Sequence, residues 1–197
     1  MNDWKLVVKI TLGCVALLFL AIWGLSKISN QTTGGLKADM QELLNGARFV
    51  KENPSASSGQ VQVTVVTFSD MQCPACKAAD AKNKELFTMS GVKVVMRHFP
   101  LPANVHKYSQ VSARAAETAN LMGKGWEMVQ VLFDKQDEWS AVSDPKIKFL
   151  EYAKSLGLDE KVFGETMEAK EVYANVALDA SLAARLQLSG TPTIYVN

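Results

Sequence analysis

Residues 61–76 read Val61-Gln62-Val63-Thr64-Val65-Val66-Thr67-Phe68-Ser69-Asp70-Met71-Gln72-Cys73-Pro74-Ala75-Cys76. The first half is β-branched and free of charge, which predicts a largely buried strand over residues 61–68. A polar turn opens at Asp70, whose side chain we expect to form an Asx turn. From Pro74 onward the residues favour a helix. The sequence therefore predicts two cysteines at a strand-to-helix junction, at the N-terminal end of the helix.

The spacing of the two cysteines suits the chemistry of a helix N-terminus. If Cys73 is the N-cap residue, Pro74 takes the first helical position, where its missing N–H is not needed. An N-cap side chain accepts hydrogen bonds from the second and third helical N–H groups, which here belong to Ala75 and Cys76. These backbone groups would favour the thiolate of Cys73 over its thiol. We predict that Cys73 is the catalytic nucleophile and Cys76 the resolving thiol.

Two other uses of the cysteine pair are less favoured by the sequence. A purely structural disulfide between Cys73 and Cys76 would close a very small loop and gain little from chain entropy. A zinc site needs further ligands at short spacing, but His98 and His106, the two histidines of the chain, are separated by seven residues. We therefore predict no metal and no other cofactor.

The N-terminal part of the chain resembles a membrane anchor. Residues 6–25 are apolar except for Lys9 and Thr11, and such a run is long enough to cross a bilayer as a helix. Basic residues at its start favour a cytoplasmic N-terminus. We predict a cytoplasmic segment over residues 1–9, a signal anchor or transmembrane helix in the lipid bilayer over 10–26, and export of the remainder.

A cleaved signal peptide is the alternative to an anchor, because Gly24 and Ser26 are small residues where a peptidase would cut. Cys14 lies inside the apolar run, and we interpret it as a small apolar residue of a membrane helix. Either route places Cys73 and Cys76 in an oxidising compartment. We predict a single-pass protein of the cell membrane with its catalytic domain on the extracytoplasmic side, either periplasmic or outer.

Charge and composition limit the remaining possibilities. The chain has 21 basic and 20 acidic residues and no basic block, so nucleic acid is not an expected partner. Residues 27–60 are predicted to be a linker with a short helix over about 36–51, and residues 61–197 one compact domain. The segment before this domain is too short for a dimerisation domain, so we expect a monomer.

Further elements follow the cysteines in an informative order. Residues 92–99 form a second strand pattern, and Thr193–Val196 a last short strand after Gly190-Thr191-Pro192. Between them the pattern is helical, with Asp144-Pro145 and Asp159 as helix starts. The predicted helices cover residues 74–89, 106–122, 126–135, 145–156, a short segment after 159, and 171–188. The sequence predicts an α/β domain with a helical block inserted between its strands.

Three motifs taken in order resemble the DsbA-like branch of the thioredoxin-fold thiol–disulfide oxidoreductases. They are Phe68-Ser69-Asp70 leading into Cys73-Pro74-Ala75-Cys76, then Arg97-His98-Phe99-Pro100-Leu101, and finally Gly190-Thr191-Pro192-Thr193. The resemblance implies a thioredoxin-like fold over residues 61–197 with a helical insertion at about 103–170. It also implies a cis peptide bond between Thr191 and Pro192, facing the thiol pair, in a loop that binds an extended substrate segment.

The sequence departs from this family at three places. Thr67 stands where relatives usually have a buried Glu that helps to move the proton of the resolving thiol. Ala75 stands where oxidising relatives often have a His beside the second cysteine. After the strand at 193–196 the family continues with an edge strand and a covering helix, whereas this sequence stops at Asn197. Without these pieces a sheet edge would lie bare, so we expect a partial sequence or a truncated gene.

The function that the resemblance implies is exchange of disulfides through Cys73–Cys76. We expect an oxidase that introduces disulfides into exported cysteine-containing proteins and is recycled by a redox partner in the membrane. Stabilising the thiolate of Cys73 would favour this direction. A disulfide isomerase or reductase of exported proteins is the first alternative, and a non-catalytic binding module or chaperone with the same fold is the second.

Overall fold

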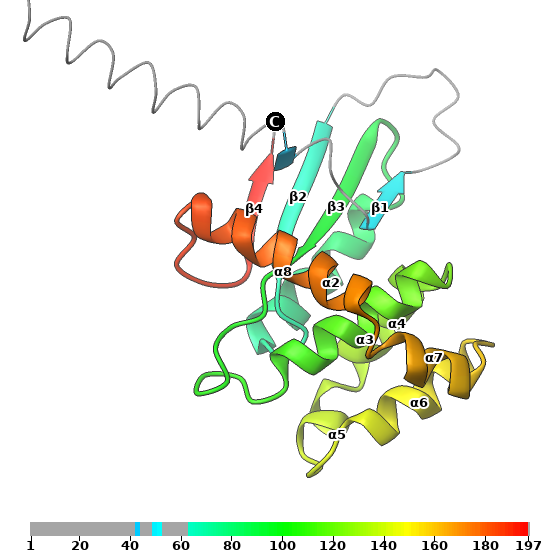
Figure 1. Ribbon diagram of the computed structural model, residues 1–197. Helices are drawn as coiled ribbons and strands as arrows, with labels where there is room; N and C mark the ends of the chain where they lie inside the picture. The colour runs from blue at the N-terminus through cyan, green and yellow to red at the C-terminus, as the bar shows by residue number, and fades with distance from the viewer. Residues whose placement is uncertain (1–41, 44–48, 53–62, 197) are drawn as a thin grey trace, which may run out of the picture. The chain divides into compact units, whose positions relative to one another are not determined.

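The computed structural model describes residues 42–43, 49–52 and 63–196 of the chain. A four-stranded sheet has the strand order β1-β3-β2-β4 (Figure 1). The central strands β2 and β3 are parallel, and both outer strands pair antiparallel. The strands are β1 (Phe49–Glu52), β2 (Val63–Ser69), β3 (Val92–His98) and β4 (Thr193–Val196). This arrangement confirms an α/β domain.

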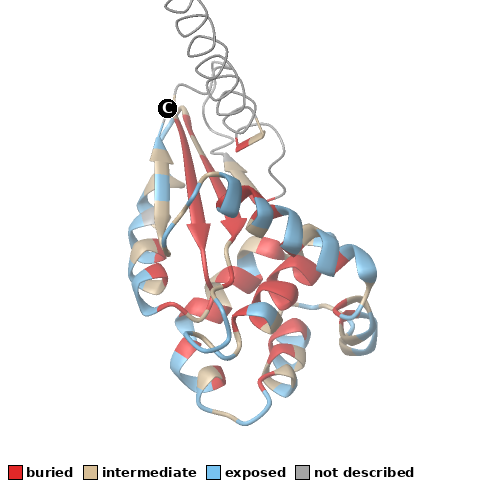
Figure 2. Ribbon diagram, turned by 60° about the vertical axis from the view of Figure 1, so that its left-hand side comes forward, coloured by how far each residue is buried: buried red, intermediate tan, exposed pale blue. Residues whose placement is uncertain are grey.

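Helices connect and cover the strands. Helix α2 joins β2 to β3, five helices lie between β3 and α8, and α8 leads to β4. The helices are α2 (Pro74–Leu86), α3 (Ser109–Leu121), α4 (Gly125–Asp134), α5 (Gln136–Ser140), α6 (Lys146–Ser155), α7 (Glu160–Thr166) and α8 (Lys170–Arg185). Helices α3 to α7 are the predicted insertion, and they lie at the end of the sheet to which β2 and β3 point (Figures 1 and 2).

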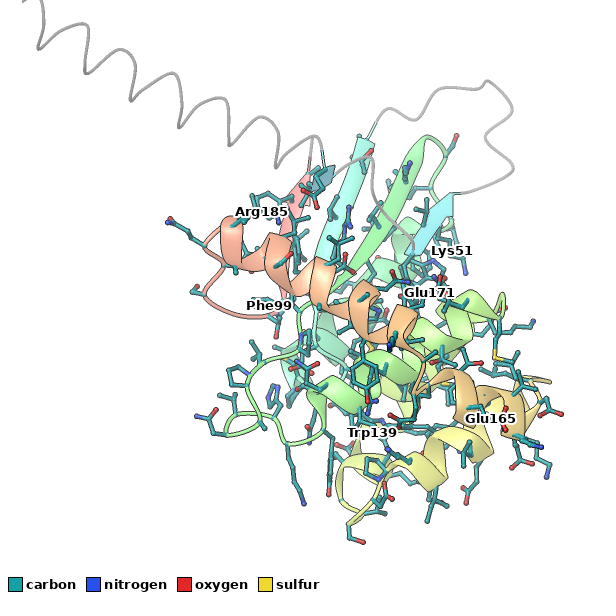
Figure 3. The ribbon with its side chains drawn as sticks, viewed as in Figure 1. Lys51, Phe99, Trp139, Glu165, Glu171 and Arg185 are labelled. Carbon is teal, nitrogen blue, oxygen red and sulfur yellow. The ribbon has the colours of Figure 1, made fainter. Side chains whose placement is uncertain are left out.

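A local sequence signal explains the start of α7, whereas α5 is fixed by tertiary contacts. Asp159 is the N-cap of α7, as predicted, and its Oδ1 accepts the N–H of Val162 at 2.9 Å. Helix α5 was not predicted, because its five residues are too few to show a helical period. It is fixed by Trp139, which is fully buried and whose Nε1 donates to the Leu132 carbonyl at 2.7 Å. The Trp139 ring lies inside the helical block (Figure 3), edge-on to Phe149.

The start of the domain differs from the prediction. Residues 49–51 were assigned to a helix within a linker, but residues 49–52 form β1, and the compact unit begins at Glu42 rather than at residue 61. The physical reason is tertiary: β3 offers an unpaired edge, and β1 pairs with it from Phe49↔Met96 to Glu52↔Lys93. Phe49 is 1% exposed and packs edge-on against His98, with ring centroids 5.0 Å apart.

The two faces of the sheet pack against different partners. On one face, Val66, Phe68 and Val95 pack against Leu182 and Ala183 of α8. Met96 points to the other face and joins a larger cluster with the helical block, which also contains Met71, Cys73, Cys76, Met128, Phe133, Trp139 and Phe149. Strands β2 and β3 are buried for most of their length, whereas β4 is intermediate to exposed (Figure 2). The cysteine pair therefore lies where the sheet meets the inserted helices.

The predicted membrane anchor over residues 10–26 lies outside the described residues. Within the ranges that are described, none of the helices combines the length and the apolar character needed to cross a bilayer.

Candidate active site

The cysteine pair is held at the N-terminus of α2. The carbonyl oxygen of Cys73 accepts the N–H groups of Cys76 and Lys77, each at 3.1 Å. Cys73 is therefore the N-cap residue, and Pro74 occupies the first helical position, as the sequence predicted. Pro74 and Ala75 are exposed. The two residues between the cysteines are thus open to solvent at the N-terminal end of α2.

The two thiols have different surroundings. Cys73 is 5% exposed, whereas Cys76 is completely buried, and both are free thiols. Burial raises the pKa of the Cys76 thiol to about 12, although the Asp70 N–H, 3.5 Å from its sulfur, opposes this shift. Cys76 therefore keeps its proton at neutral pH, and Cys73 is the sulfur that a protein substrate can approach. The roles of nucleophile and resolving thiol stay predictions.

The loop before β4 lies against the first cysteine. The Thr191–Pro192 peptide bond is cis, as the resemblance implied. The Sγ of Cys73 donates to the carbonyl oxygen of Thr191 at 3.5 Å, so the loop faces the thiol pair. Thr193 Oγ1 donates to the Gly190 carbonyl at 2.8 Å and closes the turn. Binding of substrate by Thr191 and Pro192 remains a prediction.

The structure holds Cys73 and Cys76 as free thiols, whereas the predicted stabilisation applies to the thiolate form of Cys73. In the free-thiol form, the N–H of Cys76 donates a hydrogen bond to the carbonyl oxygen of Cys73, and the thiol of Cys73 donates one to the carbonyl oxygen of Thr191. Support of the thiolate by the N–H groups of Ala75 and Cys76 stays a prediction.

Asp70 is the centre of a hydrogen-bond network that the sequence showed only in part. Its Oδ1 accepts the N–H of Gln72 at 2.8 Å, which confirms the predicted Asx turn. Its Oδ2 accepts three further donors: the Leu101 N–H at 3.0 Å, His106 Nδ1 at 2.8 Å and Ser109 Oγ at 2.6 Å. The Asp70 side chain is fully buried. This carboxyl ties the turn before Cys73 to the segment after β3.

Helix α5 also supports this turn, through Gln136. The Nε2 of Gln136 donates to the carbonyl oxygens of Met71 at 2.8 Å and Cys73 at 3.1 Å. Gln136 is 3% exposed. Nothing near position 136 in the sequence marks it as part of the site, since its partners lie more than 60 residues earlier.

Thr67 stands at the position where relatives usually have a buried Glu. Asp80, on helix α2, lines the same cavity as Thr67. Thr67 is buried, and its hydroxyl has no hydrogen-bond partner among the described residues. It lines a cavity of about 10 Å³ together with Ser69, Asp80 and Trp126. Asp80 is 5% exposed, and its burial raises the pKa of its carboxyl to about 6. The sequence analysis did not single out Asp80, although its place one turn after Cys76 was a signal for it.

Comparison with known protein families supports the resemblance. The family described as DSBA-like thioredoxin domain matches residues 64–197. A thioredoxin-like oxidoreductase from Silicibacter pomeroyi DSS-3 is 32% identical, with a TM-score of 0.61 over 76% of this chain and 79% of that one. The thiol-disulfide exchange protein alpha-DsbA2 from Wolbachia pipientis shares the fold at 21% identity, with a TM-score of 0.68 over 85% of this chain and 86% of that one.

Curated relatives are longer than this chain. The Na(+)/H(+) antiporter NhaA 3 of Salinispora tropica is 37% identical over 139 residues, which make up 70% of this chain and 20% of that protein. The chain thus spans about a fifth of the length of such relatives.

Proposed function

This chain belongs to the family of DSBA-like thioredoxin domains, and from that membership we propose that it is an extracytoplasmic thiol–disulfide oxidoreductase. In this proposal it introduces disulfides into exported cysteine-containing proteins. The observation that carries the proposal is the placement of Cys73, at the N-cap of α2 and 3.5 Å from the Thr191 carbonyl of the cis-proline loop. The antiport named for the longer relatives is not part of it, since the chain spans only a fifth of their length.

The proposed reaction starts from the Cys73–Cys76 disulfide. A substrate thiolate attacks the sulfur of Cys73, which forms a mixed disulfide and breaks the Cys73–Cys76 bond. Cys76 leaves with the electron pair and takes up a proton. A second substrate thiolate then attacks the substrate sulfur of the mixed disulfide, and Cys73 leaves as a thiolate. The substrate is oxidised by two electrons and the cysteine pair is reduced.

The cis-proline loop supplies the proposed substrate contact. The Thr191 carbonyl points to Cys73, and Pro192 leads directly into the edge strand β4. An extended substrate segment beside this loop would be recognised through backbone groups, a mode that tolerates many sequences. This suits an enzyme that oxidises different exported proteins.

The oxidising direction is proposed from the electrostatics of the helix N-terminus. Backbone N–H groups and the positive end of the helix dipole favour a thiolate at Cys73. A stabilised thiolate stabilises the reduced pair and makes its disulfide a stronger oxidant. Because Ala75 adds no positive charge, we expect a milder oxidant than a protein with a His at that place.

The proposed location follows from the sequence of the N-terminal part. Residues 10–26 would anchor the chain in the cell membrane as a single pass, with the domain on the extracytoplasmic side. A redox protein of the same membrane would reoxidise Cys73 and Cys76. We propose that the domain acts as a monomer. After reduction of the Cys73–Cys76 disulfide, labelling of Cys73 in intact cells by a membrane-impermeant thiol reagent tests the location, and labelling only after lysis would contradict it.

Two measurements on the purified chain test the reaction and its direction. The first follows the recovery of activity by reduced, unfolded ribonuclease, which we expect with the wild type and Cys14→Ser but not with Cys73→Ser. The second equilibrates Cys73–Cys76 with glutathione buffers. A reduction potential above about −200 mV supports an oxidase, whereas one near about −270 mV indicates a reductase.

The alternatives predict other results. An isomerase would reactivate ribonuclease with scrambled disulfides faster than reduced ribonuclease. A binding module or chaperone would keep its full effect in the Cys73→Ser variant, and that outcome would overturn the proposal.

A further inference from the structure

We infer that Asp80 exchanges a proton with the Cys76 thiol, through the polar lining of the cavity that Asp80 shares with Thr67. This inference rests on the proposed thiol–disulfide exchange and names the group that handles its proton. Asp80 does not touch the reacting sulfur atoms, so it acts as a proton-transfer residue rather than as a catalytic nucleophile.

Cys76 needs such a partner because it is sealed from solvent. Its exposed fraction is 0%, and it holds its proton firmly. Thiol–disulfide exchange nevertheless requires Cys76 as a thiolate whenever it attacks or leaves. A group inside the protein must therefore take up and return this proton.

Asp80 lies at the right place on α2. It follows Cys76 by four positions, so the two Cβ atoms are about 6 Å apart on the same face of the helix. Both residues are buried. Cys76 belongs to the same buried cluster as Met96 and Phe133, and these two side chains line the cavity together with Asp80. The cavity is thus bordered both by Asp80 and by two members of the buried cluster that contains Cys76.

The cavity has the size and polarity to carry a proton. Its volume is about 10 Å³, which is room for about one water molecule. Thr67 and Trp126 line it, and neither the Thr67 hydroxyl nor the Trp126 Nε1 has a hydrogen-bond partner within the described part of the chain. With the Asp80 carboxyl they provide three polar groups, a number that typically holds a buried water.

The charges around Asp80 suit a proton acceptor at neutral pH. On its own helix, Lys84 Nζ lies 3.9 Å from Asp80 Oδ2, and on α4 the carboxyl of Asp134 lies 3.3 Å from the same Lys84. From β2 the cavity receives Thr67 and Ser69, which carry no charge. Burial raises the pKa of Asp80 to about 6, with Lys84 lowering it and Asp134 raising it. A carboxyl with such a pKa is ionised at pH 7 but accepts a proton readily.

Asp70 is hydrogen-bonded to Cys76 through its backbone N–H, but its carboxyl is less suited to accept the proton of Cys76. Its carboxyl accepts four donors, and it is its backbone N–H, not its carboxyl, that faces the sulfur. The backbone of Asp70 therefore helps to orient Cys76, whereas Asp80 lines a cavity.

The proton step balances as follows. When the Cys73–Cys76 bond breaks, Cys76 leaves as a thiolate and takes a proton from Asp80 in the minority of molecules whose carboxyl is protonated at pH 7. The resulting carboxylate regains a proton from solvent. In the reverse direction, the Asp80 carboxylate takes the proton of the Cys76 thiol. The thiolate then attacks the Cys73 sulfur of a mixed disulfide and expels the partner thiolate.

Stopped-flow kinetics with 5,5′-dithiobis(2-nitrobenzoate) separates this step from the first attack. The reduced chain releases one thionitrobenzoate when Cys73 attacks and a second when Cys76 resolves the mixed disulfide. We expect the rate of the second phase to rise with pH around about 6 in the wild type. In Asp80→Asn this inflection should disappear, with the second phase at least about 10-fold slower at pH 7, while the first phase changes less than twofold.

Asp134→Asn is the matched control, because Asp134 also pairs with Lys84 but does not line the cavity. It should leave both phases within twofold of the wild type at pH 7 and move the inflection to lower pH, because Asp134 raises the pKa of Asp80. Thr67→Val, which removes only the hydroxyl, should slow the second phase at least threefold and keep the inflection. Near-UV circular dichroism checks that each variant is folded. If Asp80→Asn does not fold, the second phase of Thr67→Val provides the test.

The inference is overturned if Asp80→Asn, when folded, keeps both the inflection and a second phase within twofold of the wild type. For an unfolded Asp80→Asn, an unchanged second phase in Thr67→Val overturns it. A wild-type chain that shows neither phase would instead refute the proposed function and the inference with it.

Discussion

The sulfur of Cys73 lies 3.5 Å from the carbonyl oxygen of Thr191, although the two are 118 positions apart in the chain. The register of β4 produces this contact. Thr193 pairs with Phe68 near the end of β2, so the residues that precede Thr193 continue past this end, toward the turn that carries Cys73. The edge strand thus places the cis-proline loop against the thiol pair.

The two thiols should react differently with alkylating agents. At pH 7 we expect iodoacetamide to modify Cys73 in the reduced, folded chain and to leave Cys76 unmodified, because the buried Cys76 thiol has a strongly raised pKa and only thiolates react. Peptide mapping by mass spectrometry measures both sites. In denaturant both should be modified. Equal modification of both cysteines in the folded chain would contradict the assigned surroundings.

Loss of the Asp70 carboxylate should destabilise the domain. In Asp70→Asn, one oxygen becomes an NH₂ group that faces the donors Leu101 N–H, His106 or Ser109. Because a buried donor without an acceptor costs about 1–3 kcal/mol, we expect the free energy of unfolding to fall by about 2–4 kcal/mol. Urea denaturation measures this change.

Asp137→Asn is the control for this substitution. The Asp137 side chain is 91% exposed and pairs with Lys77 on the surface, so we expect a change within about 0.5 kcal/mol. Equal effects of the two substitutions would show that the Asp70 network adds nothing to stability.

Asp80 should make the domain less stable at neutral pH than in acid. Burial raises the pKa of its carboxyl from 3.8 to about 6 in the folded state, so the folded protein holds an additional proton between these values. Stability therefore falls as the pH rises through this window. After allowance for screening by Lys84 and solvent, we expect Asp80→Asn to stabilise the chain by about 1–2 kcal/mol at pH 7.

The gain from Asp80→Asn should vanish below about pH 4. Denaturation curves of both proteins at pH 3.5 and pH 7.5 check this dependence. If Asp80→Asn destabilises the chain equally at both pH values, burial does not raise the pKa of the Asp80 carboxyl.

Phe49 should contribute as a core residue although the sequence placed it in a linker. It is 1% exposed and packs against His98 and Trp126. We expect Phe49→Ala to lower the free energy of unfolding by about 3–5 kcal/mol. Leu178→Ala, on the exposed side of α8 at 47% exposure, should change it by less than about 1 kcal/mol. Guanidinium denaturation compares the two, and a negligible effect of Phe49→Ala would argue against β1 as part of the domain.

The sequence predicted those features that depend on neighbouring residues. Helix capping acts within three or four positions, so Cys73 and Asp159 were correctly assigned as N-cap residues. The Asx turn at Asp70 spans two residues and was also predicted. In contrast, β1 forms because β3 has a free edge about 45 residues later, and no local pattern in Phe49–Glu52 distinguishes an edge strand from a helix turn.

From the sequence alone came the class of the fold, the two thiols at a strand-to-helix junction, the helical insertion and, by resemblance, the cis-proline loop. Only the tertiary structure decided how these thiols are surrounded. The donors on Asp70, the support by Gln136 and the shared cavity of Thr67 and Asp80 join separate elements. The reason is physical: capping and hydrophobic periodicity are set within a few residues, whereas burial and hydrogen-bond partners depend on which distant segments the sheet register brings together.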